Sequence, residues 1–295
     1  MGQGSAPVEA DFGAFEHAAW MRQAKGYERH FENLVQQAVE PLLDAAAVRA
    51  GSDVLDAACG PGFVTGAAIR RGANAIGVDF SEEMLRIARA RHPWARFERG
   101  DAEDLPFPDA SFDAVAINFG ILHFPEPRRA LREAFRVLRP GGSLAFTDWA
   151  APGPDNIAYA IVLSAMDRHA APFRLPPGPP LFQFAREAVC REALAEAGFD
   201  TPSVDTRLLC LTWRQATADG LVSAFRDGSA RLGARLKAQP AERLAAIRDA
   251  VAQRSLTYWT ADGFAIPTGI ALTRARKPVF AAAVPAPSIG ALVDA

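Results

Sequence analysis

Residues 54–62 read Val-Leu-Asp-Ala-Ala-Cys-Gly-Pro-Gly, and this stretch decides the fold. A short apolar run typical of a buried strand leads into a tight glycine-rich turn, and a helical pattern follows over 63–71. Glycines in such a turn let a ligand approach the backbone, and the N-terminus of the helix offers free N–H groups. Dinucleotide-binding proteins use a similar loop, G-x-G-x-x-G, but here the third glycine is Gly66, whereas that pattern needs it at Thr65. The loop alone therefore predicts a ligand site without naming the ligand.

Strand and helix patterns alternate around this loop. Strands are expected at 53–58, 74–79, 95–99, 112–118 and 143–149, with helices between them at 63–71, 81–91 and 126–138. This alternation predicts a parallel sheet with helices on both faces. Two later strands, at 203–213 and 263–273, complete a mostly parallel, seven-stranded sheet. The expected fold class is therefore α/β and doubly wound, which binds ligands at the carboxyl ends of its strands.

The rest of the chain divides by pattern into parts around a core at 51–150. Residues 1–50 hold two helical patterns, expected at 12–26 and 31–48. Residues 151–277 hold the remaining strands and two insertions, at about 151–181 and 215–260. Both insertions follow strands, so we expect them to fold over the ligand edge of the sheet as a helical cap. Residues 278–295 are rich in Ala and Pro and are expected to form a flexible tail.

The composition excludes several classes of protein. The chain has 295 residues, and 49% are hydrophobic, which excludes a disordered or fibrous chain. A formal net charge of −2 does not indicate the basic surface that binds nucleic acid or an anionic membrane. The three cysteines are far apart and form no disulfide framework, so a reducing cytoplasm is the expected location. Abundant Ala and a preference for Arg over Lys indicate a bacterial source.

An acid stands at the end of each of three successive strands. Asp56 lies just before the glycine loop, where it would repel a pyrophosphate but suits a ligand with an ammonium or sulfonium group. Asp79 can accept hydrogen bonds from both hydroxyls of a ribose, and Asp101 can accept one from an adenine amino group. A nucleoside with a positively charged tail fits this arrangement.

Four segments carry a family resemblance. Leu55–Gly62, Gly77–Ser81, Gly100–Ala102 and Leu138–Gly142 resemble the class I S-adenosylmethionine-dependent methyltransferases, most of all the UbiE-like enzymes that act on small molecules. The resemblance covers about residues 50–150, and the motifs are specific because they occur together and in order. One departure is Ala58, since the family's loop usually begins with glycine at this position.

The resemblance implies the cofactor S-adenosylmethionine (SAM) and its product S-adenosylhomocysteine (SAH). Gly60 and Gly62 are expected to face its methionine part, Asp79 the ribose, and Asp101 with Ala102 the adenine. In this family the N-terminal helices often close over the cofactor, which is expected of residues 1–50. The full set of expected cofactor-binding residues is Tyr27, Asp56, Ala58, Gly60, Gly62, Asp79, Phe80, Met84, Asp101, Ala102 and Asn118.

The acceptor is expected to be a small, aromatic or apolar organic molecule. Residues 118–121 read Asn-Phe-Gly-Ile, without the two prolines that methylases of nucleic-acid and glutamine amino groups usually carry there. His123, just past a strand end, is the expected general base, and Asp148 is the next candidate; a packing role for either stays open. The sequence predicts no metal site, because no His and carboxylate cluster has metal-ligand spacing. Aromatic residues in the insertions suit an apolar ring in the acceptor.

The expected reaction is O-methylation by in-line displacement, in secondary metabolism or quinone-like chemistry. C- or N-methylation of such a molecule is the alternative reaction. A non-catalytic SAM- or SAH-binding protein and a nicotinamide-dependent oxidoreductase are the alternatives of other classes. The protein is expected to be a monomer or a homodimer with a small-molecule acceptor as its partner.

Overall fold

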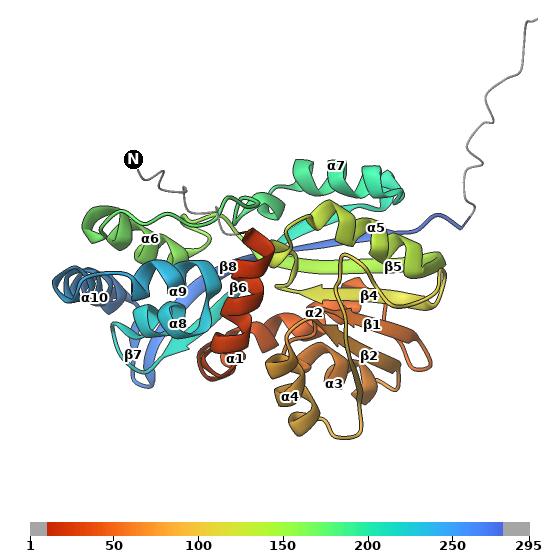
Figure 1. The fold of residues 1–295 in the computed structure, drawn as a ribbon, viewed down its shortest axis with the longest axis horizontal. Coiled ribbons are helices and arrows are strands. Elements are labelled where there is room, and N and C mark those ends of the chain that lie inside the picture. The colour runs from red at the N-terminus through yellow and green to blue at the C-terminus, as the bar shows by residue number, and fades with distance from the viewer. Residues whose placement is uncertain (1–10, 280–295) are drawn as a thin grey trace, which may run out of the picture.

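All seven strands that the sequence pattern predicts are present in the computed structural model, which describes residues 11–279 (Figure 1). Within this part the sheet has eight strands in the order β3-β2-β1-β4-β5-β8-β6, and the eighth, the two-residue β7, pairs with β8. Only β8 runs opposite to the others, because it pairs antiparallel with β5, β6 and β7. The strands are β1 Asp53–Ala57, β2 Asn74–Asp79, β3 Arg96–Arg99, β4 Phe112–Asn118, β5 Leu138–Trp149, β6 Asp205–Gln215, β7 Trp259–Thr260 and β8 Gly263–Arg276.

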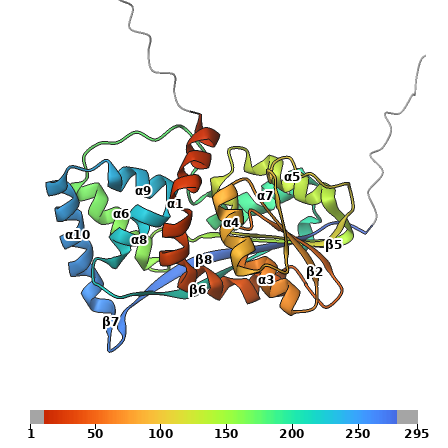
Figure 2. The same ribbon diagram turned by 60° about the horizontal axis from the view of Figure 1, so that its bottom comes forward.

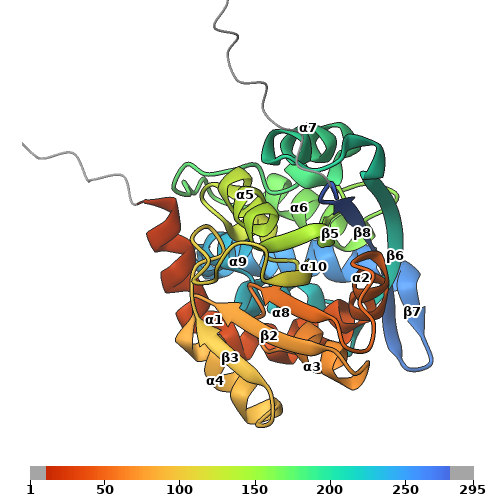
Figure 3. The same cartoon turned by 90° about the vertical axis from the view of Figure 1, so that its right-hand side faces the viewer.

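Helices cover both faces of the sheet, with α5 and α7 on one face and α2, α3 and α4 on the other (Figure 3). Residues along each strand alternate between two cores. Val54 of β1 packs into the core beside α2 and α3, whereas its neighbour Leu55 packs into the core beside α5 and α7. The helices are α1 Phe12–Val35, α2 Val39–Ala45, α3 Phe63–Arg70, α4 Glu82–Arg91, α5 Pro127–Val137, α6 Ile157–His169, α7 Glu187–Ala197, α8 Gly220–Gly228, α9 Ala230–Lys237 and α10 Ala241–Ser255.

The expected bounds of the two N-terminal helices, 12–26 and 31–48, are wrong. The helix α1 does not end at Gly26 but continues to Val35, and α2 follows after one 3₁₀ turn. A Cβ at Gly26 would lie 1.9 Å from the carbonyl oxygen of Asp227 in α8. Glycine is therefore used here for a close approach of two helices, and not to end one.

Gly26→Ala is expected to destabilise the protein by about 1–3 kcal/mol, the usual range for overpacking a tight contact. The added methyl would push α1 away from α8. Thermal unfolding of the variant measures the effect as a lower Tm. Lys25→Ala is the matched control, because Lys25 is exposed on the same helix and its loss should change stability by less than about 0.5 kcal/mol. An unchanged Tm in Gly26→Ala would contradict the close contact between α1 and α8 at Gly26.

A second group of helices lies beyond the sheet. The helix α6 comes from the insertion at 151–181, and α8, α9 and α10 come from the insertion at 215–260. These four helices gather on one side of α1, while the core with β1 to β5 lies on the other (Figures 1 and 2). The N-terminal helix thus runs between the glycine-loop end of the sheet and the inserted helices.

Within residues 11–279, no helix combines the length and apolar character that crossing a membrane requires. The expected tail, 278–295, lies almost entirely outside the described residues, so its flexibility stays a prediction.

Candidate active site

The glycine loop joins β1 to α3 through three residues in the left-handed region of the backbone. Ala58 has φ 56°, Gly60 has φ 51° and Gly62 has φ 80°. A positive φ strains any residue with a Cβ, which is the physical reason for glycine being usual at the position of Ala58. Gly62 also needs its small size, because a Cβ there would lie 2.8 Å from the Phe97 ring.

Asp56 stabilises the loop from behind. It is buried in β1, and its Oδ2 accepts hydrogen bonds from the backbone N–H of Thr65 at 2.9 Å and from the Thr65 hydroxyl at 2.7 Å. Burial raises the pKa of Asp56 to about 7, against the lowering effect of these two hydrogen bonds. The carboxyl group therefore fixes the start of α3, and Asp56 does not line the cavity in front of the loop.

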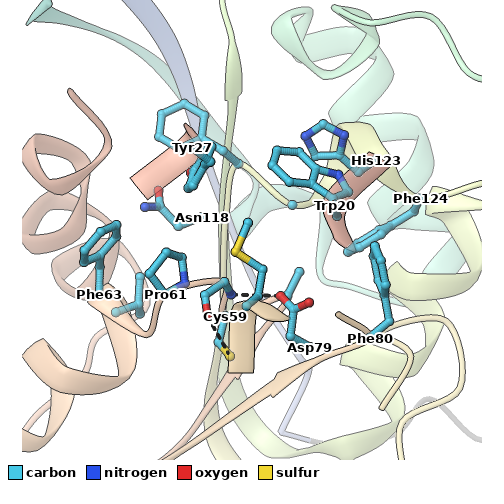
Figure 4. A pocket seen from close by; sticks show the side chains of 16 residues that line it. Trp20, Tyr27, Cys59, Pro61, Phe63, Asp79, Phe80, Asn118, His123 and Phe124 are labelled. Atoms are coloured by element: carbon cyan, nitrogen blue, oxygen red, sulfur yellow. Dashed lines mark hydrogen bonds between the residues drawn. The ribbon is translucent and has the colours of Figure 1, made fainter. Parts of the chain in front are cut away.

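Asp79, at the end of β2, faces that cavity (Figure 4). Its Oδ2 accepts the backbone N–H of Gly60 and its Oδ1 accepts that of Ser81, both at 2.8 Å. Burial raises the pKa of Asp79 to about 6, although both amides act to lower it. Each carboxylate oxygen has two lone pairs, so each can accept one further hydrogen bond.

The loop cavity, as we call this space, contains about 580 Å³ of empty space, part of which is open to solvent. It lies between the glycine loop, the start of α4, the end of β4 and α1. In Figure 4, the rings of Trp20 and His123 lie beside each other, on the same side of the cavity as Phe80. The lining residues are Trp20, Tyr27, Ala58, Cys59, Gly60, Pro61, Phe63, Val64, Asp79, Phe80, Met84, Asn118, Phe119, Gly120, His123 and Phe124.

The structure brings together only part of the expected site. Seven of the expected cofactor residues line the loop cavity: Tyr27, Ala58, Gly60, Asp79, Phe80, Met84 and Asn118. Asp56, Gly62, Asp101 and Ala102 do not line it. Asp101 is exposed beyond β3, and its Oδ1 accepts the backbone N–H of Glu103 at 2.9 Å, while Ala102 is buried. A role of Asp101 and Ala102 toward adenine stays a prediction.

A second space, the aromatic chamber, adjoins the loop cavity and shares Trp20, Tyr27, Phe119 and His123 with it. It contains about 380 Å³ of empty space, part of which is open to solvent. Both insertions contribute to its wall, the first through Tyr159 and the second through Ser229. The lining residues are Trp20, Tyr27, Phe31, Phe119, Leu122, His123, Trp149, Tyr159, Leu181, Gly228, Ser229, Arg231 and Leu232.

Phe119 stands between the two spaces in a strained conformation. Its φ is 55°, which is uncommon for a bulky residue. The backbone N–H donates to Oγ1 of Thr147 at 2.9 Å, and the ring stacks on Trp149 with 4.1 Å between ring centroids. Strain of this kind persists only where the surroundings impose it, and such residues cluster at functional sites.

His123 carries the main feature that the sequence did not show, a contact with Glu16. Nδ1 of His123 lies 2.9 Å from Oε2 of Glu16, which belongs to α1. Glu16 is almost fully buried, and it also accepts hydrogen bonds from Nε1 of Trp20 at 3.2 Å and from Nε of Arg231 at 3.0 Å. A signal was present in the sequence, because Glu16 lies one helical turn from Phe12 and from Trp20 on the apolar face of α1.

Asp148 lies apart from both cavities. It is fully buried in β5, where Oδ1 accepts the backbone N–H of Trp149 at 2.7 Å. Its Oδ2 has no hydrogen-bond partner within residues 11–279. Burial raises the pKa of Asp148 to about 8. This placement gives no support to a catalytic role.

Asp148→Asn is expected to raise the free energy of unfolding, and by more at pH 8 than at pH 5. The pKa of Asp148 is about 8 in the folded protein, whereas its usual value is 3.8. Between pH 3.8 and pH 8, the carboxyl group is therefore ionised in the unfolded chain but still protonated in the folded protein. Wild-type stability therefore falls as the pH rises through this interval, whereas asparagine has no proton to release. Urea unfolding at both pH values measures the difference, with the exposed Asp167→Asn as control. An equal gain in the free energy of unfolding at pH 5 and pH 8 would contradict the raised pKa of Asp148.

No group of three or more His, Cys, Asp or Glu side chains that could hold a metal ion occurs in the part of the chain that the structure describes.

Comparison with known families identifies the segment that carries the glycine loop. A family model described as a methyltransferase domain matches residues 55–146, which run from β1 into β5. The demethylmenaquinone methyltransferase of Paenarthrobacter aurescens is 41% identical over 111 residues, 38% of this chain and 44% of that protein. The protein of the same name from Thermus thermophilus is 39% identical over 137 residues, 44% of this chain and 61% of that protein. The chain spans about half the length of these curated relatives, and the expected resemblance is confirmed.

Solved structures share the fold over most of this chain. A candidate methyltransferase from Bacillus halodurans C-125 is 26% identical with a TM-score of 0.53, over 82% of this chain and 99% of that one. The [4+2]-cyclase SpnF is 20% identical with a TM-score of 0.56, over 94% of this chain and 100% of that one. The likeness to the cyclase shows the fold alone. The expected doubly wound, mostly parallel architecture is confirmed.

Proposed function

We propose that this chain, whose residues 55–146 resemble the methyltransferase domain of class I SAM-dependent enzymes, methylates a hydroxyl group of a small aromatic or apolar molecule. The observation that carries the proposal is the pair of adjoining cavities that share His123. One cavity has the features of a nucleoside site, and the other those of a site for an apolar ring. A residue able to take a proton stands where they join.

The loop cavity fits SAM. The Asp79 carboxylate can accept hydrogen bonds from a ribose, and the side chains of Phe80 and Met84 offer apolar contact to an adenine. At Gly60 the space is open, because a Cβ there would meet nothing within 4 Å. When bound, SAM supplies an electrophilic methyl group on a positively charged sulfur.

The aromatic chamber is the acceptor site in this proposal. Phe31, Phe119, Trp149 and Tyr159 give it apolar walls that suit a planar ring. Within residues 11–279, no hydrogen bond engages the hydroxyls of Tyr159 or of Tyr27, so they are available to orient polar groups of the acceptor. Most of these residues lie outside the matched segment 55–146, so the curated relatives do not identify the acceptor of this chain.

His123 is the general base in this proposal. The acceptor hydroxyl gives its proton to the imidazole, its oxygen forms the new O–CH₃ bond, and the methyl–sulfur bond breaks to leave SAH as a neutral thioether. Trp20 and Phe119 line both spaces and restrict water around the reacting atoms. Atoms and charge balance, because the proton on His123 replaces the positive charge that the sulfur loses.

The test is methyl transfer from isotope-labelled SAM to a panel of phenols, enols, anilines and quinone-like compounds. Mass spectrometry and NMR of the product locate the label. The proposal predicts the label on oxygen. A label on carbon or nitrogen would favour the alternative reactions, and the names of the curated relatives keep quinone-like acceptors in the panel. Binding of SAH without turnover of any compound would favour a non-catalytic binding protein.

A further inference from the structure

We propose that Glu16 is the positioning residue of His123, and that its carboxylate holds the imidazole in the tautomer with the proton on Nδ1. Nε2 then keeps its lone pair and is the atom that takes the acceptor proton. The inference rests on the proposed function and extends it to a residue of α1 that lies 107 positions from His123 in the sequence.

The hydrogen bonds of Glu16 decide the tautomer. Glu16 pairs with the permanently charged guanidinium of Arg231 at 3.0 Å, so its side chain is an ionised carboxylate. Burial raises the pKa of Glu16, but His123 and Arg231 together bring it below its usual value. An ionised carboxylate only accepts hydrogen bonds. The proton in the 2.9 Å contact between Oε2 and Nδ1 therefore lies on Nδ1 of His123. Nε2 takes part in no hydrogen bond among residues 11–279, and His123 lines both cavities.

Arg231 holds this arrangement in place. Its Nε donates to Oε1 of Glu16 at 3.0 Å, and its terminal nitrogens donate to the backbone carbonyls of Leu122 and Pro179. Leu122 directly precedes His123, so one guanidinium fixes both the carboxylate and the backbone beside the imidazole. The Arg231 side chain is 9% exposed and that of Glu16 is 2% exposed, which leaves little room for either to rotate away.

The rings around His123 restrict it further. Trp20 donates from Nε1 to the same Oε2 that contacts His123, and its ring meets the imidazole edge to face, with 4.7 Å between centroids. Glu16 and Trp20 both belong to α1, while Arg231 belongs to α9. The base is thus oriented only when the N-terminal helix and the inserted helices are both docked.

A purely structural role of Glu16 is the competing explanation, because a buried Glu–Arg pair that links two helices also needs both partners. The two explanations differ in one respect. A structural pair affects folding whatever stands at position 123, whereas a positioning residue affects turnover only through His123.

The experiment is a double-mutant cycle of Glu16→Gln and His123→Asn. Glu16→Gln is expected to lower kcat about tenfold or more while the KM for SAM stays unchanged, since the base is misoriented and the loop cavity is intact. In the His123→Asn background, Glu16→Gln should cause no further loss. Independent, multiplying losses would overturn the proposal. Glu28→Gln is the matched control on α1, because Glu28 pairs with Arg91 on the surface.

A second measurement needs no turnover and no change at Glu16. In protein labelled with ¹⁵N-histidine, the nitrogen shifts of neutral His123 report which ring nitrogen carries the proton, with His123→Asn assigning the signals. The proposal predicts a protonated Nδ1 and a bare Nε2. A protonated Nε2 would overturn it. Absence of methyl transfer in the wild type would instead defeat the proposed function, and the shifts would still decide the tautomer.

Discussion

Replacing His123 by asparagine is expected to lower kcat by about two orders of magnitude and to leave the affinity for SAH unchanged. A positioned general base contributes on this scale, and asparagine has no group that takes up a proton at neutral pH. The asparagine amide can still donate to the buried carboxylate of Glu16, so the variant keeps that group satisfied. Single-turnover kinetics with labelled SAM measure the chemical step, and calorimetry measures the binding of SAH.

His169→Asn is the control for this prediction, because His169 lies at the end of α6 and lines neither cavity. It should leave both kcat and affinity unchanged. Full activity of His123→Asn would reduce His123 to a packing role and would make positioning the dominant source of catalysis. A large loss of SAH affinity would instead place His123 in the cofactor site.

Asp79→Asn is expected to weaken SAH binding by about 1–3 kcal/mol, the scale of hydrogen bonds to a charged group. Asparagine offers one oxygen and one NH₂ group where the carboxylate accepts the N–H groups of Gly60 and Ser81. The NH₂ group would face one of these backbone N–H donors, so a hydrogen bond that holds the glycine loop or the start of α4 is lost. A hydrogen bond to the ribose is lost as well. Calorimetric titration with SAH measures the change.

The pH dependence of wild-type binding gives a second measure of the same group. The pKa of Asp79 is raised to about 6 by burial, so the carboxylate is ionised at pH 7.5 and becomes protonated below pH 6. SAH affinity should therefore be lower at pH 5 than at pH 7.5 in the wild type, with a smaller difference in Asp79→Asn. Asp104→Asn is the control, because Asp104 is exposed and lines neither cavity. The same pH dependence in wild type and Asp79→Asn would assign the titration to another group.

The core of the fold was predictable because local patterns specify it. The strand and helix around 54–62 follow from one apolar run and one glycine turn, and Ser81 caps α4 as its position suggests, with its hydroxyl accepting the N–H of Met84. The error at Gly26 has a different origin. A glycine that ends a helix and a glycine that admits a second helix look the same in sequence, and only the carbonyl of Asp227 distinguishes them.

The residues of the site were predictable only where they follow the ends of strands. Asp79 and His123 follow strand ends, which a parallel sheet brings to one edge. Arg231 is 215 positions from Glu16, and no local pattern connects them. Their contact depends on how α9 packs against α1, which is a property of the insertions. Asp148 shows the opposite case, since its position at a strand end was visible but its burial away from both cavities was not.

The most direct test of the central claim is a calorimetric titration of the purified full chain with SAH, with NADH titrated in parallel. The claim is that the cavity in front of residues 58–62 binds the SAM nucleoside beside Asp79. It predicts micromolar binding of SAH, no binding of NADH, and weaker SAH binding by Asp79→Asn. Binding of NADH alone, or of neither compound by a folded protein, would contradict it.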